Sequence, residues 1–373
     1  MINALALTLI AAVMDWDDEE ATREYKWLKL MSSVKYDGYS DFRAGVRFLE
    51  NLATWLRQFK PENRRAAYSF VRNRLVYISS AEMQRVVETF IPEIVTPHLR
   101  KEAAEEVGIK AYQTWGSVVG VEASNKLLRR SLFVGLSDGS RIDILRRANS
   151  GKLVQDQVVP LLDIGQEKWK DLKDELTDEL GPDARFDNVY LIDDFTASGT
   201  TFIRRSDDGK WKGKLKKFND LVCTARQQLG DDFPIAENYH LHIHHYVSTH
   251  QARIALIERV EFADKNWQEK SFASFEITES LLLPPELKMT AASDDAMLEI
   301  CDAYYDDHLY QRLKKHCDEA GQDNMKRGYA NCTLPLILEH NTPNNSIPLL
   351  WAETPGELGH TMSPLFRRRD RHG

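Results

Sequence analysis

The sequence has few cysteines, no long apolar run and no excess of basic residues. None of the four cysteines shows the C-x-x-C spacing of a zinc ribbon or redox motif, which favours reduced thiols in a cytoplasmic protein; they are Cys223, Cys301, Cys317 and Cys332. No apolar segment reaches the roughly 20 residues that a membrane-spanning helix needs. The net charge of -8 argues against a general nucleic-acid coat and leaves only local basic patches as a route to nucleic acid.

The composition is that of a globular chain with a sizeable core. The chain has 373 residues, of which 42% are hydrophobic and 28% charged, so about two domains are expected. The apolar N-terminus, residues 1–14, lacks the basic region of a secretory leader, and acidic residues follow it directly. We therefore expect it to form a helix that docks on the core.

The chain divides into three expected regions. Residues 1–115 carry apolar stripes at helical spacing, such as Phe48 to Phe59, and are predicted to be a helical N-terminal region. Residues 116–355 show an α/β pattern, with an insertion at about 262–326. Residues 356–373 end in the basic run 367–371 and are predicted to be a disordered tail.

The stretch Val189–Thr201 is the most informative part of the sequence. Its apolar residues predict a buried parallel strand, and Asp193 and Asp194 follow where open α/β sheets place their ligands. Small and hydroxylated residues come next, before an expected helix start, in the order Thr196, Ala197, Ser198, Gly199, Thr200 and Thr201. Backbone N–H groups, hydroxyls and a helix N-terminus together suit a phosphate, and paired carboxylates suit a ribose diol. An ordinary strand–turn–helix is the alternative.

This pattern resembles the ribose-phosphate loop of the type I phosphoribosyltransferases. The resemblance implies that Asp193 and Asp194 are catalytic residues that contact the ribose hydroxyls of phosphoribosyl pyrophosphate. It also implies that the loop from Thr196 to Thr201 binds the 5′-phosphate. Ala197 departs from the family pattern, in which many members have threonine, so this position offers no hydroxyl to the ligand.

A second small-residue loop follows an earlier strand candidate at 132–136. Its residues are Ser137, Asp138, Gly139, Ser140 and Arg141. The Asp-Gly pair is typical of a hairpin leading into a second strand at 141–145. In phosphoribosyltransferases, however, an early strand leads into a loop that binds pyrophosphate, and the sequence leaves both interpretations open.

The segment Arg204–Lys217 is strongly basic, with seven Lys or Arg against Asp207 and Asp208. We expect a short hairpin with Trp211 at its tip. A solvated basic face is the usual meaning of such a run. Beside a phosphate site it could instead recruit a nucleotide or nucleic acid, with Trp211 stacking on a base.

Three histidines alternate along the strand predicted at 239–248. His240, His242 and His244 could ligate a metal from one face of the strand. Because no neighbouring Asp, Glu or Cys completes an obvious set, hydrogen-bonded histidines are the favoured interpretation, and no protein metal ligands are assigned.

A polar loop follows the strand expected at 332–338. Asn341, Asn344 and Asn345 could read a base or phosphate at that strand's end. The same residues are also good turn formers that need no ligand, and the sequence favours neither interpretation.

The chain as a whole resembles the phosphoribosyltransferase-like proteins of bacterial conflict and anti-phage defence systems. The resemblance rests on residues 48–59, 135–143, 191–201 and 340–351. It implies a Rossmann-like, mainly parallel sheet flanked by helices, a helical N-terminal region, and a partner protein encoded nearby.

Two functions of different class remain. The first is an enzyme that binds phosphoribosyl pyrophosphate with Mg²⁺, as the resemblance implies, and reacts at the ribose C1, with a nucleotide or nucleic acid as acceptor. The second is an inert module that senses a nucleotide or binds a partner. The intact acid pair favours the enzyme, and the lack of a recognisable hood over an acceptor base favours the module.

Overall fold

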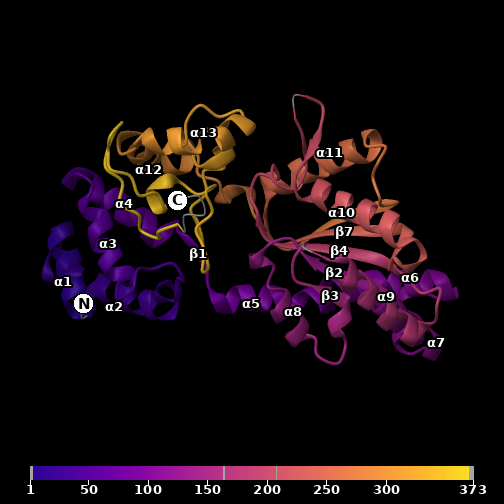
Figure 1. The fold of residues 1–373 in the computed structure, drawn as a ribbon. Helices are drawn as coiled ribbons and strands as arrows, with labels where there is room; N and C mark the ends of the chain where they lie inside the picture. The colour runs from indigo at the N-terminus through magenta and orange to yellow at the C-terminus, as the bar shows by residue number, and fades with distance from the viewer. Residues whose placement is uncertain (1–2, 163, 207, 369–373) are drawn as a thin grey trace. The chain divides into compact units, whose positions relative to one another are not determined.

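The computed structural model describes residues 3–162, 164–206 and 208–368, and these fall into two compact units. Unit 1 comprises residues 1–82 and 284–373, and unit 2 comprises residues 83–283. Figure 1 shows their elements, and each unit is described by itself. No helix in the described ranges is both long and apolar enough to cross a bilayer.

Unit 1 is mostly helical and is built from both ends of the chain. Its helices are α1 (Asn3–Met14), α2 (Asp18–Val34), α3 (Phe48–Arg57), α4 (Pro61–Asn73), α12 (Ala291–Ala303) and α13 (His308–Glu319). A parallel pair joins the two chain segments, β1 (Val76–Ile78) with β9 (Leu336–Leu338). α1 docks through Ala6 and Ile10, as its apolar sequence predicts, because these side chains are buried in the shared core.

Unit 2 contains a five-stranded parallel sheet in the order β3-β2-β4-β7-β8. The strands are β2 (Ser131–Gly135), β3 (Val158–Val159), β4 (Phe186–Thr196), β7 (Ile235–Thr249) and β8 (Ser274–Leu283). The predicted α/β class with a mainly parallel sheet is confirmed. β2 and β4 are neighbours, so the two loops singled out in the sequence leave the sheet at the same edge.

Helices cover both faces of this sheet (Figure 1). One face packs against α9 (Gln166–Leu180), α10 (Lys214–Leu229) and α11 (His250–Asn266), whose apolar residues share a core with Leu191 and Leu241. Against the other face, Phe90 contacts Phe133, Tyr190 and His244. Phe90 begins a π-helical segment, Phe90–Val95, between α5 (Ser80–Thr89) and α6 (Thr96–Val107). α7 (Val118–Arg129) then leads into β2.

The region boundaries differ from those expected. Residues 83–115 contribute helices to unit 2, and β8, expected within an insertion, is a strand of the central sheet. The expected disorder of residues 356–373 also fails for the described part, because Leu365 and Phe366 are fully buried in unit 1. Apolar residues directly before the basic run anchor this segment in the core. Residues 369–373 lie outside the described ranges.

The expected strand at 141–145 is wrong, and with it the hairpin. α8 (Ile142–Ala148) occupies this segment. Arg141 has φ +49°, a left-handed conformation that turns the chain out of the preceding loop. Ile142 and Leu145 are both buried, and their three-residue spacing places them on one face of α8. The apolar residues of this segment therefore fit a helix as well as a strand.

Candidate functional site

The acid pair lies within the end of β4, not in the loop behind it. Asp193 pairs in register with His245 of β7, and the strand continues to Thr196. Successive side chains of a strand point to opposite faces, so the two carboxylates approach different surroundings. Asp193 is buried, and Asp194 is half-buried.

Both oxygens of Asp193 have partners from other elements. The Ser137 hydroxyl donates to Oδ1 at 2.6 Å, and the Lys214 ammonium at the start of α10 donates to Oδ2. Burial raises the pKa of Asp193, although the Lys214 charge acts in the opposite direction. The 137–141 loop and the first turn of α10 therefore meet at this one carboxylate.

Asp194 lies against the same loop. A Cβ atom added to Gly139 would lie 2.5 Å from Asp194 Oδ2 and 2.7 Å from its Cγ, so a side chain there would displace the carboxylate. Burial lowers the pKa of Arg141, while the nearby Asp194 carboxylate raises it. Ser140 holds the loop by accepting the Leu136 and Ser137 N–H groups, each at 3.0 Å. The structure thus brings the candidate pyrophosphate loop, residues 137–141, to both acids.

The loop expected to bind the 5′-phosphate is tightly held. The hydroxyls of Ser198 and Thr200 are 2.9 Å apart, and Thr249 donates to the Ala197 carbonyl at 2.7 Å. Gly199 has φ +67° and faces α11, where an added Cβ would lie 3.2 Å from the Ala252 carbonyl. A glycine is required here for both conformation and space.

Positive groups surround that loop. Arg204 and Arg259 donate to the carbonyls of Thr200 and Ser198, each at 3.3 Å. Arg259 could not be placed here from the sequence, because it lies on α11, about 60 residues farther along the chain. These cations, together with Lys214, make the end of the sheet suitable for an anionic ligand.

The helix expected directly after Thr201 begins later, because the basic hairpin comes first. Strands β5 (Arg204–Arg205) and β6 (Trp211–Lys212) pair antiparallel, and α10 begins only at Lys214. The N–H groups of Lys214 and Leu215 nevertheless donate to the carbonyls of Thr201 and Phe202, at 3.2 and 3.0 Å. These two hydrogen bonds hold the first turn of α10 against the end of the loop, on the other side of the hairpin.

Trp211 is not at the hairpin tip. It lies on the returning strand, half-buried, with its ring 5.8 Å from that of Trp267 and 5.9 Å from that of Phe262. This packing opposes the predicted stacking on a base. The exposed basic residues of the run include Arg205, Lys210, Lys212 and Lys217. Asp207, counted in the basic run, lies outside the described residues.

His245 was not singled out in the sequence. It is buried beside the acid pair, with its ring 5.8 Å from that of Phe202. Burial lowers the pKa of His245 to about 3, helped by the Lys214 charge and opposed by Asp194. The imidazole is therefore neutral at physiological pH.

The structure separates the three alternating histidines. His244 is fully buried and contacts the hydroxyls of Thr278 at 2.9 Å and Ser280 at 3.0 Å. This agrees with the favoured hydrogen-bonded interpretation. His240 and His242 instead join two residues that the sequence did not associate with them, His98 and Glu276.

The asparagine loop belongs to unit 1, whereas both acids belong to unit 2. Asn345 is buried and donates to the Tyr329 carbonyl at 3.1 Å. The Asn344 carbonyl accepts the Tyr329 N–H at 2.7 Å, and the Asn341 N–H donates to the Leu338 carbonyl at 3.1 Å. These bonds are those of a turn that braces its own unit.

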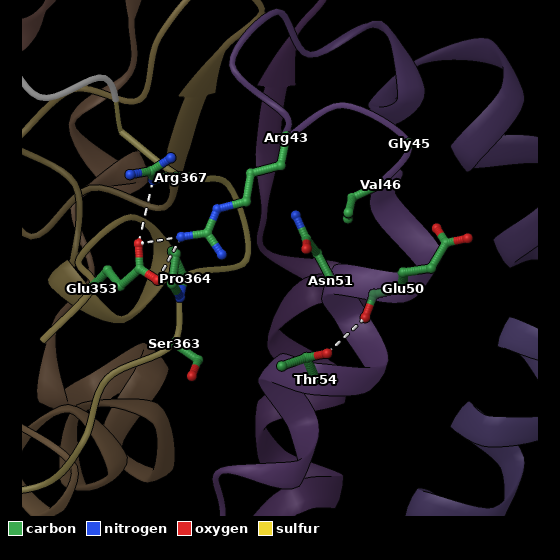
Figure 2. Close-up of a pocket in the computed structure, with 10 residues that line it drawn as sticks. All are labelled: Arg43, Gly45, Val46, Glu50, Asn51, Thr54, Glu353, Ser363, Pro364 and Arg367. Carbon is green, nitrogen blue, oxygen red and sulfur yellow. Dashed lines mark hydrogen bonds and ion pairs between the residues drawn. The ribbon is translucent and has the colours of Figure 1, made fainter. Parts of the chain in front are cut away.

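Two pockets have linings that include neither acid. In unit 1, a pocket of about 350 Å³ contains Arg43 and Arg367, which both contact Glu353 (Figure 2). In unit 2, a pocket of about 460 Å³ contains Arg100, stacked 3.3 Å over the Trp115 ring. Neither pocket is lined by a residue predicted from the sequence to bind a ligand.

The sequence matches the model of one known protein family. The PRTase-CE family matches residues 52–368, which is most of the sequence. The chain belongs to the PRTase-CE family. No curated protein and no solved structure matched it.

The PRTase-CE match covers most of unit 1 as well as unit 2. It includes both acids, the 137–141 loop, Lys214 and Arg259. The predicted kinship with phosphoribosyltransferases is thereby confirmed at the level of the family.

Proposed function

We propose that unit 2 binds a phosphoribosyl ligand, such as phosphoribosyl pyrophosphate, at the carboxyl ends of β2 and β4. The observation that carries the proposal is the 2.6 Å hydrogen bond from Ser137 to Asp193, which joins the 137–141 loop to the end of β4, the strand that leads into the 196–201 loop. Asp193 and Asp194 would hold the ribose diol. Residues 196–201 would hold the 5′-phosphate, and residues 137–141 the pyrophosphate.

The surrounding charges support an anionic ligand. Arg204 and Arg259 contact the backbone of the 5′-phosphate loop, and Arg141 lies near Asp194. Cations fixed before the ligand arrives need no reorganisation on binding, and they stabilise developing negative charge on a departing pyrophosphate. The carboxylates would stabilise the positive charge that grows at C1 as that bond breaks.

Mg²⁺ fits this site as a companion of the ligand. The ion prefers oxygen donors and is usually bound by one or two carboxylates together with substrate phosphates. Lys214 already neutralises Asp193, so Asp194 is the carboxylate placed to contact a hydrated ion. When bound, Mg²⁺ would neutralise pyrophosphate charge.

A catalytically inert sensor is the second candidate. The contacts of Asp193 favour it, because Ser137 and Lys214 occupy both carboxylate oxygens within the protein itself. A ribose diol would have to displace or share these partners, and an internal ion pair of this kind can also serve structure alone.

Calorimetric titration with phosphoribosyl pyrophosphate and Mg²⁺, followed by a pyrophosphate-release assay, tests both candidates. We expect binding by the wild type and its loss in Asp193→Asn and Asp194→Asn. Asp187→Asn is the matched control, because Asp187 lies on the same strand and pairs with Arg130 at 2.7 Å. No binding by the wild type would overturn the proposal, and binding without pyrophosphate release would select the sensor.

We further propose that the protein acts in anti-phage defence with a partner encoded nearby, a role supported by its family resemblance. Plaque counts on a bacterial host carrying the gene with its neighbours test this role. We expect protection that Asp194→Asn abolishes and Asp187→Asn retains. Equal plaque counts with and without the wild-type genes, across a broad phage panel, would contradict it.

A further inference from the structure

Four metal-ligand side chains meet in unit 2, away from the acid pair. His98 comes from α6, His240 and His242 from β7, and Glu276 from β8. Each offers one ligand atom, and the four atoms lie within 4.8 Å of one another. We propose that these residues form a zinc site that fastens α6 to the sheet.

The distances within the cluster suit a tetrahedral ion. Glu276 Oε2 lies 3.3 Å from His98 Nδ1 and 3.5 Å from His242 Nδ1. Two donor atoms bound to zinc at about 2.0–2.1 Å with a tetrahedral angle lie about 3.3 Å apart. Those two edges therefore already have the required length, and a pair at the 4.8 Å limit would close by about 1.5 Å on binding.

Outer groups face two of the histidines. His242 Nε2 lies 2.9 Å from Asn188 Oδ1, and His98 Nε2 faces Glu102 Oε1 at 3.4 Å, an ion-pair distance without hydrogen-bond geometry. An amide oxygen only accepts, so His242 carries its proton on Nε2 and presents the Nδ1 lone pair. A carboxylate or carbonyl behind a ligating imidazole is the usual outer shell of a metal site.

His240 completes the pattern. Its Nδ1 lies 2.5 Å from Ser274 Oγ, while its Nε2 is buried with no hydrogen-bond partner among the described residues. A buried nitrogen left in this state is costly, and a metal would satisfy it. Asn188 also donates to Glu102 at 3.2 Å, so two outer partners are linked to each other.

The charges balance around a divalent ion. Three neutral imidazoles and one carboxylate leave a zinc complex with one positive charge, and Glu102 compensates it in the outer shell. Four protein ligands are typical of a closed structural site, so no catalytic role is assigned to the ion. Mg²⁺ prefers all-oxygen surroundings and should not bind.

Metal binding by the untagged full-length chain tests the site. After chelator treatment, we expect about one Zn²⁺ per chain, measured by competition with a chromophoric chelator. Co²⁺ should give an intense visible spectrum of tetrahedral type without thiolate charge-transfer bands. Absence of Zn²⁺ binding, binding of Mg²⁺ alone, or thiolate bands from Co²⁺ would each overturn the proposal.

Variants then assign the ligands. His98→Gln and Glu276→Gln should each weaken Zn²⁺ binding by about 100-fold or more, since loss of an outer partner alone costs 10–100-fold. Glu279→Gln is the matched control, because Glu279 lies on the same strand but pairs with Arg253 at 2.8 Å. Circular dichroism of the metal-free variants checks folding, and unchanged affinity in both folded ligand variants would overturn the assignment.

Discussion

Two polar clusters occupy the same sheet of unit 2, and they are assembled in opposite ways. The acid cluster joins Asp193 to Ser137 and Lys214 through hydrogen bonds that are already made. The histidine cluster leaves a buried nitrogen of His240 without a partner among the described residues. The groups of the first cluster already bond to one another, so a ligand must displace or share those bonds. A ligand of the second cluster would add a contact at His240 Nε2.

The largest expected effect concerns the acid cluster. Lys214→Met would leave Asp193 buried without its cation, which typically costs about 3–5 kcal/mol of unfolding free energy. Chemical denaturation at neutral pH measures the loss. Lys216→Met is the control, because Lys216 pairs with the exposed Asp220 and should cost about 1 kcal/mol or less.

The double variant Lys214→Met/Asp193→Asn tests whether the loss of stability comes from the unpaired carboxylate. Removing both charges should recover much of the stability, because the penalty comes from the unpaired carboxylate. If Lys214→Met is as stable as the wild type, the acid cluster is not held together by its charge pair, and the contrast with the histidine cluster is lost.

A smaller effect is expected at Gly139. Gly139→Ala places a Cβ 2.5 Å from Asp194 Oδ2, and such overpacking typically costs about 1–3 kcal/mol. Binding of phosphoribosyl pyrophosphate should weaken at least about tenfold, since each tenfold change is only about 1.4 kcal/mol. Denaturation and calorimetric titration measure the two effects separately. Gly165→Ala is the control, because nothing lies within 4 Å of its added Cβ.

A residue behind the histidine cluster tests whether its ligands are oriented for a metal. Asn188→Ala removes the acceptor behind His242 and should weaken Zn²⁺ binding about tenfold. Thr278→Val is the control, because Thr278 contacts His244, which is not a ligand. Equal affinities of the two variants in the chelator competition would mean that Asn188 does not orient His242.

The smallest effect is a dependence on pH. Burial lowers the pKa of His245 to about 3, so below about pH 6.5 the unfolded chain binds a proton that the native state does not. His245 therefore costs no stability above pH 6.5, and its cost grows as the pH falls from there toward 3. Between pH 7.5 and 5.5 the loss should be about 1 kcal/mol.

His245→Gln should remove this part of the pH dependence. Urea denaturation of wild type and variant at both pH values gives the comparison. An equal loss of stability in the two proteins would show that His245 is protonated in the native state.

Local patterns predicted the strand that carries the acid pair, whereas the contacts of Asp193 with Ser137 and Lys214 come from the fold. Four apolar residues before Asp193 and Asp194 predicted a buried strand, and the small residues after them predicted a loop. The conformation of Arg141 was not predictable, because a left-handed arginine depends on how the following helix packs.

The histidine cluster could not be predicted in the same way. His240 and His242 were visible as an alternation, but Glu276 enters through pairing of β7 with β8, and His98 through packing of α6. Glu276 is distant from the histidines in sequence but lies opposite His242 across the strand pair. Tertiary structure alone supplies that proximity.

The pairing of β1 with β9 has a consequence for the order in which the chain can fold during synthesis. Residues 83–283 form one continuous unit, so unit 2 can fold once they have left the ribosome. The first 82 residues must wait until Leu336–Leu338 and Phe366 emerge before their core closes. Folding during translation would therefore complete the middle of this protein before its beginning.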